Sequence, residues 1–117
     1  MEGGSSIVQV SSGSAYIGSP LQYAASKGAL NSLTIGLVAP LGRKGIRINT
    51  VSPGMTETEM IADTLPSFDL SQIPAGRVGT VDEVAAVVAW LCSEEASYVA
   101  GANVRVAGGR PPGTTLG

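Results

Sequence analysis

Tyr23 and Lys27 are the two residues of this sequence whose types and spacing could perform proton transfer. They lie four positions apart in YAASKGAL, so a helix beginning here would place both side chains on one face. A free tyrosine has a pKa of about 10, which an adjacent ammonium group and the positive end of a helix both lower. Such a tyrosine could take a proton from an alcohol or give one to a carbonyl. Alone, the pair is weak evidence, because the same spacing suits a partly buried tyrosine beside a lysine that reaches water.

The sequence contains no histidine and a single cysteine, and this composition excludes several other kinds of site. Ser-His-Asp catalysis, Cys-His catalysis and the common zinc sites need these residues, so we predict no metal site. Cys92 lies in an apolar stretch, and we interpret it as a small core residue. Because a lone thiol suits a reducing compartment, we expect a cytoplasmic protein.

The overall composition indicates a core-forming chain rather than a disordered one. Of the 117 residues, 44% are hydrophobic and 14% are charged. The net charge of −2 gives no electrostatic reason to expect a nucleic acid as partner. No apolar run approaches the roughly 20 residues that span a bilayer, so we expect no membrane partner. The opening MEGGSSIVQV has no basic region and no long apolar core, and we do not expect it to be a signal peptide.

The elements that must position Tyr23 and Lys27 begin with a short strand. Ile7 to Val10 is β-rich and apolar, which predicts a buried strand. After a serine- and glycine-rich turn, a helical pattern begins at about Tyr23. Pro40 removes a backbone donor in the last turn, so we expect it to kink or end this helix. The predicted core stripe of the helix repeats at three- and four-residue steps: Ala25, Ala29, Leu30, Leu33, Leu37 and Leu41.

Further along the chain, a second strand is predicted at residues 46–52 and a third at residues 103–107. Residues 55–79 lack strong periodicity, and we expect a loop there with a short helix around 57–64. Thr80 and Glu83 form a capping box that begins the next helix. Its predicted core stripe is Val84, Val87, Val88 and Leu91. This alternation of strands and helices implies crossover connections and a parallel sheet of α/β type.

The sequence resembles the C-terminal half of a classical short-chain dehydrogenase/reductase. The resemblance covers about residues 4–109, in family order: IVQVSS, YAASKGAL, GIRINTVSPGMTETEM and RVGTVDEVAAVVAWLCSEEASYVAGANVRVAGG. It implies the C-terminal portion of a Rossmann-type doubly wound parallel sheet, with about three strands and crossover helices. We therefore expect residues 1–117 to form a single partial domain, with a loose tail at residues 110–117.

The resemblance also implies roles for individual residues. Tyr23 resembles the family's acid/base, and Lys27 the lysine that promotes ionisation of that tyrosine and binds the nicotinamide ribose. Ser12 resembles the serine that orients the substrate oxygen. The implied reaction is hydride transfer between a nicotinamide, in NAD or NADP, and a small alcohol or ketone. The loop that borders the cofactor is implied to contain Pro53, Gly54, Thr56 and Thr58, and the substrate lid to extend from Met55 to Gly79.

Three features depart from the family pattern, and one of them is Pro40, which stands where the family usually continues its helix with a polar residue. The family's N-terminal half, with its glycine-rich phosphate turn, has no counterpart in this sequence. Ser12 and Tyr23 are 11 residues apart, two fewer than in the family, so Ser11 and Ser14 are fallback candidates for the catalytic serine.

Two interpretations of function stay open. The first is an NAD(P)-dependent oxidoreductase whose full-length form we expect to be a homo-oligomer. The second is a truncated, non-catalytic fragment that acts as an interaction partner or is an inert product. The strand at Ile7 to Val10 supports the second, because the family places another strand beside it and its edge would otherwise be exposed.

Overall fold

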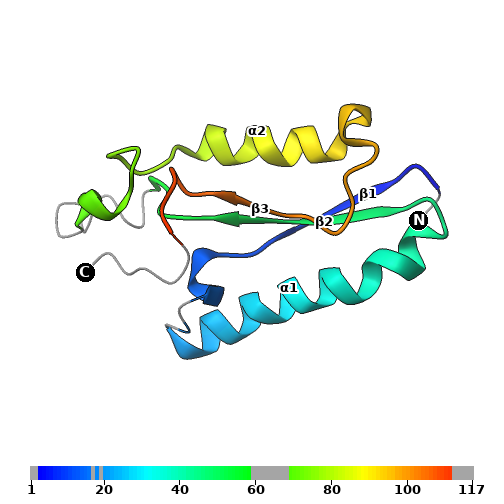
Figure 1. The fold of residues 1–117 in the computed structure, drawn as a ribbon, viewed down its shortest axis with the longest axis horizontal. Helices are drawn as coiled ribbons and strands as arrows, with labels where there is room; N and C mark the ends of the chain where they lie inside the picture. Colours follow the sequence, from blue (N-terminus) through cyan, green and yellow to red (C-terminus); the bar gives the residue numbers. More distant parts are fainter. Residues whose placement is uncertain (1–2, 17, 19, 59–68, 112–117) are drawn as a thin grey trace.

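Three parallel strands form the centre of the structure, with a long helix against each face (Figure 1). The computed structural model describes residues 3–16, 18, 20–58 and 69–111. In this part of the chain the strands are β1 (Ser6–Val10), β2 (Arg47–Pro53) and β3 (Asn103–Val106), and the sheet has the order β1-β2-β3. Both strand pairs are parallel. The predicted α/β class with crossover connections is confirmed.

The helices lie on opposite faces of this sheet (Figure 1). Helix α1 spans Leu21–Gly42 and helix α2 spans Val81–Cys92. Among the described residues, the connections contain the short 3-10 helices η1 (Gly13–Tyr16), η3 (Leu70–Gln72) and η4 (Glu94–Ala96). The predicted strand bounds agree with the observed ones to within one residue at each end.

The central strand β2 is buried from Ile48 to Ser52, although several of its side chains are polar. Each of these polar groups is paired with another part of the chain, as buried polar groups must be. The Arg47 guanidinium donates to three carbonyl oxygens at the end of α2 and just beyond it, those of Leu91 (2.9 Å), Ser93 (3.1 Å) and Ala96 (2.9 Å). A cation is favourable at a helix C-terminus, where carbonyls lack partners within the helix.

Asn49 and Thr50 attach β2 to two further segments. The Asn49 amide donates to the carbonyl of Val99 and accepts from the N–H of Ala102, both at 2.9 Å. The Thr50 hydroxyl donates to the hydroxyl of Thr34 in α1 at 2.8 Å, and both side chains are buried. Side-chain hydrogen bonds from one strand therefore fix both helices and the connection into β3.

Helix α1 differs from its prediction at its C-terminal end. It continues through Pro40 to Gly42 rather than ending at the proline. Pro40 stands in the last turn, so its missing N–H costs one hydrogen bond and the remaining turn can still form. The helix is followed by Gly45, whose φ of +75° favours glycine, and the N–H of Ile46 returns to the carbonyl of Leu41.

The predicted core stripe of α1 is contradicted in part. Ala25, Ala29 and Leu33 are exposed, whereas the fully buried residues of the helix are Ala24 and Thr34. Leu30, Leu37 and Leu41 are half-buried. The helix is apolar on most sides, so its periodicity did not define one buried face. The small Ala24 and the bond between Thr34 and Thr50 select the side that contacts the sheet.

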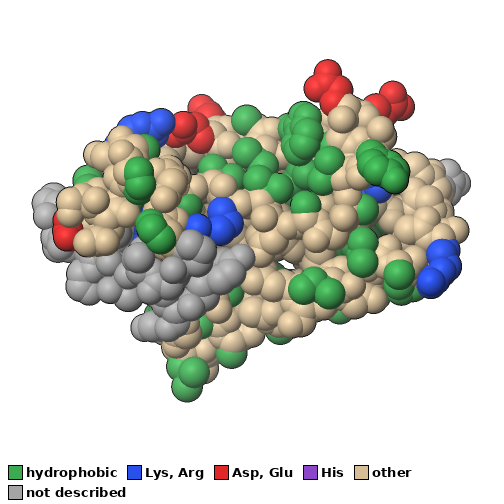
Figure 2. Space-filling model, in the orientation of Figure 1, with side chains coloured by type: hydrophobic (Ala, Val, Ile, Leu, Met, Phe, Trp, Pro, Cys, Tyr) green, Lys and Arg blue, Asp and Glu red, His purple; other side chains and the backbone are tan. Residues whose placement is uncertain are grey.

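Helix α2 agrees better with its predicted stripe, since Leu91 is fully buried and Val84, Val87 and Val88 are half-buried. The prediction for Cys92 is wrong, because its side chain is exposed. Neighbouring helix residues point about 100° apart, so the burial of Leu91 turns Cys92 toward solvent. Figure 2 shows hydrophobic side chains at the surface along α2 and the segment after it, where Val81, Trp90 and Tyr98 are exposed.

The predicted capping box at the start of α2 is confirmed. Thr80 accepts from the N–H of Glu83 at 3.2 Å, and the Glu83 carboxylate accepts from the N–H of Thr80 at 2.9 Å. The same carboxylate accepts two bonds from the Arg77 guanidinium, at 2.8 and 2.9 Å. These bonds, with that of Arg77 the largest, lower the pKa of Glu83 from 4.5 to about 2.

This lowered pKa predicts a pH-dependent contribution to stability. Because the carboxylate is favoured in the folded state, its contribution is present above pH 4.5 and is lost as the pH falls toward about 2. We expect Glu83→Gln to lower stability at neutral pH and to flatten its acid dependence in this window. Urea unfolding at a series of pH values measures both effects, with Glu95→Gln as an exposed control. If the stability of Glu83→Gln and that of the unmodified chain fell equally as the pH is lowered, the pH dependence could not be assigned to Glu83.

Candidate active site

The predicted site residues gather where the three parallel strands end (Figure 1). Ser11 and Ser12 directly follow β1, and Gly54 follows β2. Tyr23 and Lys27 lie in the first two turns of α1, which begins at this same edge. In open parallel sheets the carboxyl ends of the strands form the crevice in which ligands bind. The structure therefore brings the predicted serine, tyrosine and lysine to the edge where a site is expected.

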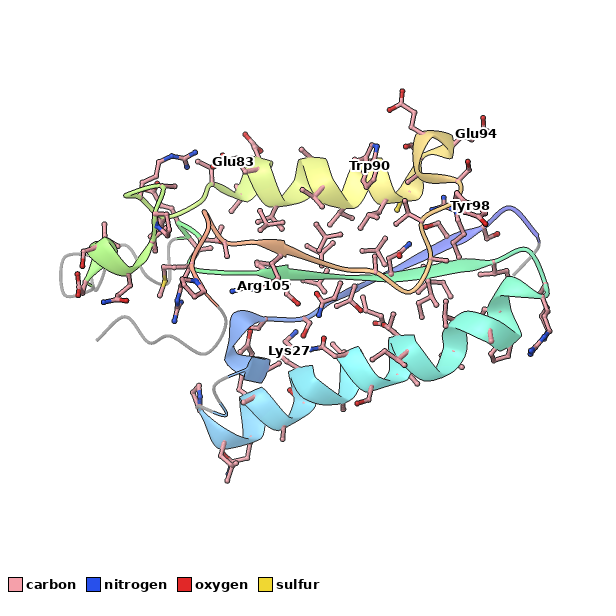
Figure 3. The ribbon with its side chains drawn as sticks, in the orientation of Figure 1. Lys27, Glu83, Trp90, Glu94, Tyr98 and Arg105 are labelled. Atoms are coloured by element: carbon pink, nitrogen blue, oxygen red, sulfur yellow. The ribbon has the colours of Figure 1, made fainter. Side chains whose placement is uncertain are left out.

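Lys27 contacts both the tyrosine and the end of β1. Its ammonium nitrogen lies 5.6 Å from the centroid of the Tyr23 ring, within cation–π range. The same nitrogen donates to the carbonyl oxygen of Val10 at 3.1 Å. Figure 3 shows Lys27 pointing from α1 toward the sheet. The Tyr23 side chain is 48% exposed, so solvent or a ligand can reach it.

The two serines after β1 have different environments. Ser11 is 3% exposed, and its hydroxyl donates to the backbone carbonyl of Lys27 at 3.0 Å. Its N–H donates to the carbonyl of Val51 and so continues the hydrogen bonding between β1 and β2. Ser12 is half-buried at the start of η1, where its carbonyl accepts from the N–H of Ala15. Ser11 is therefore a structural anchor for the helix, and Ser12 is the better candidate to meet a substrate. The side chain of Ser14 lies outside the described part of the structure.

The loop after β2 approaches the end of β3 closely. The N–H of Gly54 donates to the carbonyl of Val106 at 2.9 Å. A Cβ atom at position 54 would lie 2.9 Å from Cβ and 3.1 Å from Cα of Ala107, so only glycine fits there. The hydroxyl of Thr56 donates back to the carbonyl of Gly54 at 3.1 Å, and Thr58 is exposed. Three of the predicted cofactor-loop residues, Pro53, Gly54 and Thr56, thus form a short, internally bonded turn beside the site.

Backbone contacts join the two ends of the segment that was predicted to form the lid. Thr56 pairs with Gly79 in an isolated bridge, and the N–H of Gly79 donates to the carbonyl of Met55 at 3.0 Å. Most of the short helix expected at 57–64 lies outside the described residues. In the described part of this segment, the regular helical element is the 3-10 helix η3.

Sequence reasoning missed the polar residues that hold the site in place. Ser11 was only a fallback for catalysis, and no role was predicted for Arg47, Asn49 or Thr50. The available signal was the presence of these polar residues in otherwise apolar strands, because such residues are buried only when they are paired. The sequence does not specify the partners, which lie 16 to 53 positions away.

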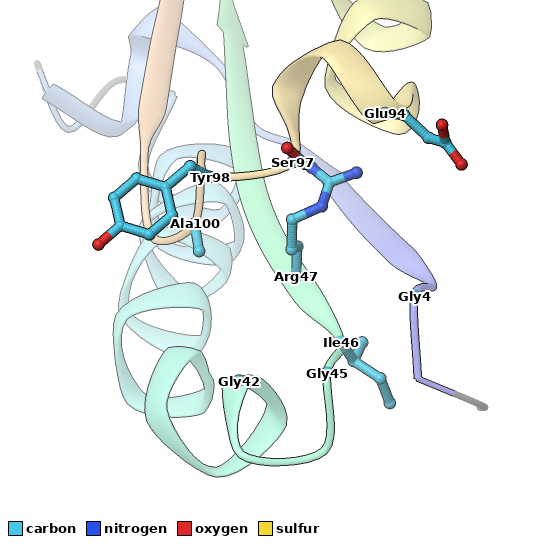
Figure 4. Close-up of a pocket in the computed structure, with 9 residues that line it drawn as sticks. All are labelled: Gly4, Gly42, Gly45, Ile46, Arg47, Glu94, Ser97, Tyr98 and Ala100. Carbon is cyan, nitrogen blue, oxygen red and sulfur yellow. The ribbon is translucent and has the colours of Figure 1, made fainter.

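A hollow of about 750 Å³ lies at the opposite ends of the strands (Figure 4). Gly4, Gly45, Arg47, Glu94 and Tyr98 are among its lining residues. The Arg47 guanidinium already donates to the three carbonyls of α2 and the following turn, so Arg47 is not available to bind a ligand in this hollow. We assign no catalytic role to it.

Two other kinds of site can be assessed in the described part of the chain. Among these residues, no three His, Cys, Asp or Glu side chains are grouped so that they could hold a metal ion. None of the described helices has the length and apolarity needed to cross a membrane.

Comparison with known proteins shows extensive similarity to one group. A family model described as Enoyl-(Acyl carrier protein) reductase matches residues 1–110. The chain is 44% identical to an uncharacterized oxidoreductase of Escherichia coli, YgfF, over 114 residues, which covers 92% of this chain and 46% of the relative.

Solved structures agree with this similarity. A short-chain dehydrogenase/reductase of Brucella melitensis, titled glucose/ribitol dehydrogenase, superposes with a TM-score of 0.85 at 40% identity, over 95% of this chain and 47% of the other. A 3-oxoacyl-[acyl-carrier protein] reductase of Brucella melitensis, solved with bound NAD, superposes with a TM-score of 0.80 at 38% identity, over 89% of this chain and 40% of the other. The chain thus spans less than half the length of these relatives.

The anchoring role of Ser11 can be tested by stability. Ser11→Ala removes the bond from a buried hydroxyl to the backbone of Lys27. We expect the free energy of unfolding to fall by about 1 kcal/mol, the usual net contribution of one hydrogen bond. Ser26→Ala is the matched control, because its exposed hydroxyl also donates to a helix carbonyl and its loss should cost less than about 0.5 kcal/mol. If urea unfolding showed equal changes in the free energy of unfolding for the two substitutions, the anchoring role of Ser11 would be refuted.

Proposed function

Because the chain belongs to the classical short-chain dehydrogenase/reductase family, we propose that it carries the proton-transfer part of an NAD(P)-dependent oxidoreductase site. The proposed reaction is reversible hydride transfer between a nicotinamide and the carbon of a small alcohol or ketone. The observation that carries the proposal is the placement of Tyr23 and Lys27 together in α1 at the carboxyl edge of the sheet.

The described residues at this edge fit the nicotinamide end of a dinucleotide. Lys27 offers an ammonium donor for ribose hydroxyls, and Tyr23, which is half exposed, can be reached by a substrate beside its ring. We assign Pro53, Gly54, Thr56 and Thr58 to the border of the nicotinamide. The bound NAD of the Brucella melitensis 3-oxoacyl reductase supports a nicotinamide cofactor in general, and either NAD or NADP is compatible with this proposal.

The cofactor, when bound, supplies the hydride chemistry, and the protein moves one proton. Tyr23 gives a proton to the carbonyl oxygen in reduction and takes it back in oxidation. The Lys27 ammonium lies 5.6 Å from the centroid of the Tyr23 ring, and we propose that it holds the ring in place and binds the nicotinamide ribose. We propose that the hydroxyl of Ser12 holds the reacting oxygen by a hydrogen bond, so that the proton is transferred over a short distance.

The catalytic assignment of Tyr23 can be tested in a hybrid reductase. In this hybrid, residues 4–109 of the chain replace the matched segment of the Brucella melitensis 3-oxoacyl reductase. Tyr23→Phe keeps the ring and removes the hydroxyl, so we expect turnover to fall by about 100- to 10,000-fold. The measurement is NADH oxidation that depends on a 3-oxoacyl substrate, at equal amounts of folded protein.

Tyr98→Phe is the matched control, because Tyr98 is fully exposed and lies at the other end of the strands, beside the hollow. It should leave turnover unchanged. Near-normal turnover of the Tyr23→Phe hybrid would eliminate the acid/base role. A hybrid that folds and binds NADH without any turnover would instead favour the non-catalytic alternative, in which the chain acts only as an interaction partner.

A further prediction concerns the 117-residue chain tested by itself. Tight binding of a dinucleotide needs its pyrophosphate held on a glycine-rich turn at a helix N-terminus. In the described residues, neither the turn before α1 nor that before α2 has this pattern, and α1 begins after Pro20 without a side-chain cap. We expect calorimetric titration with NAD(H) and NADP(H) to show no tight binding. Micromolar affinity in a monodisperse monomer would mean that the dinucleotide site lies elsewhere.

A further inference from the structure

Two arginines meet at the end of strand β3. Arg105 lies within β3, and Arg110 follows shortly after the strand ends. The Arg105 guanidinium donates from Nη1 to the backbone carbonyl of Arg110 at 2.8 Å, and the N–H of Arg110 donates to the carbonyl of Ala107 at 3.1 Å. Both arginines are half-buried. The chain therefore turns back after β3 and places a second basic residue against the first.

The turn between the two arginines has a well-defined conformation. Gly108 and Gly109 have φ angles of +61° and +86°, a region that favours glycine. The carbonyl of Gly108 accepts from the N–H of Ala75 at 3.0 Å, and a Cβ atom on Gly108 would lie only 2.9 Å from Cγ2 of Ile73. The turn is thus packed against the described end of the segment that was predicted to form the lid. These contacts fix where the chain places Arg110.

Arg105 lies on the face of the sheet that carries the candidate site. It pairs in register with Ser52, and paired positions of neighbouring strands have their side chains on the same face. Thr50, two residues before Ser52, bonds to Thr34 of α1, so this is the face that α1 covers. Figure 3 shows Arg105 and Lys27 on this same side of the sheet.

The end of β3 also borders the turn that we assign to the nicotinamide. The carbonyl of Val106, the residue after Arg105, accepts from the N–H of Gly54 at 2.9 Å. The two arginines therefore lie between the cofactor turn and the segment predicted to form the lid. A substrate enclosed between these segments would meet the arginines with the part of it that does not react.

The chemistry of the pair favours an oxyanion. A guanidinium presents planar N–H donors that match the oxygens of a carboxylate or a phosphate. Burial and, to a smaller extent, the charge of Arg105 lower the pKa of Arg110. The two cations therefore disfavour each other in this half-buried position, and an anion bound between them would offset that cost.

We propose that Arg105 and Arg110 bind an anionic group of the substrate, a carboxylate or a phosphate, while its carbonyl or carbinol carbon lies at Tyr23. This inference rests on the proposed function and narrows its substrate from any small alcohol or ketone to one that carries an oxyanion. The arginines take no part in proton transfer, and their role is to determine specificity. A neutral substrate of similar shape would lack this contact.

Titration of the 117-residue chain with simple anions tests the site without any turnover. The Nε–H signals of Arg105 and Arg110 are followed by NMR with sodium acetate, sodium phosphate and sodium chloride at equal ionic strength. We expect saturable shifts with acetate and phosphate, and the anion that binds more tightly identifies the group that the site prefers. Shifts that do not saturate, or that chloride produces equally, would overturn the proposal.

Substitution of Arg110 tests whether these shifts report the proposed site. Arg110→Gln removes one charge and keeps both backbone bonds of this residue, so the turn should stay folded. We expect the dissociation constant of the preferred anion, measured at the Arg105 signal, to rise about tenfold or more, the range for a hydrogen bond to a charged group. Arg43→Gln is the matched control, because Arg43 is exposed at the far end of α1, and it should bind like the unmodified chain. Equal dissociation constants in the two variants would overturn the proposal.

Substrate choice can be tested in a hybrid reductase that carries residues 4–110 of the chain in place of the matched segment of the Brucella melitensis 3-oxoacyl reductase. Acetoacetate and its ethyl ester share the reacting ketone and differ in charge, so the ratio of their kcat/KM values measures recognition of the carboxylate. We expect Arg110→Gln to lower this ratio about tenfold or more, and Arg43→Gln to keep it. An unchanged ratio in Arg110→Gln would overturn the proposal. Because the anion titration needs no turnover, failure of the arginine site is distinguished from failure of the proposed catalysis.

Discussion

The fold depends on one requirement: the polar side chains of the buried strand β2 must all be paired. Burying an unpaired polar group costs several kcal/mol in an apolar environment, so each such residue dictates a neighbour. Arg47 requires the carbonyls that end α2, Asn49 requires the segment that enters β3, and Thr50 requires Thr34 of α1. These partners come from both faces of the sheet and from the neighbouring strand. The central strand therefore fixes the arrangement of the elements around it.

The candidate site follows from that arrangement. The bond between Thr34 and Thr50 holds the middle of α1 against the sheet, and the bond from Ser11 to the Lys27 carbonyl holds its first turns against the end of β1. With its backbone fixed twice, α1 presents Tyr23 and Lys27 at the carboxyl edge. The side chain of Lys27 contacts both the Tyr23 ring and the carbonyl of Val10.

Much of this architecture could be predicted from the sequence, and the failures have physical causes. Strands and caps depend on local residues, so β1, β2 and the capping box at Thr80 were predicted closely. The buried face of α1 was partly wrong because that helix is apolar on most sides, and its contacts are selected by a distant hydroxyl pair. The exposure of Cys92 was missed because hydrophobicity alone does not show which way the last helical residue points.

The central claim is that Tyr23 and Lys27 form the proton-transfer part of a nicotinamide site. The most direct test is a crystal structure of the hybrid reductase with NAD bound. We expect the Lys27 ammonium to lie within hydrogen-bond distance of the ribose hydroxyls, with the Tyr23 hydroxyl beside the nicotinamide. A nicotinamide bound away from Tyr23, with Lys27 out of reach of the ribose, would contradict the account.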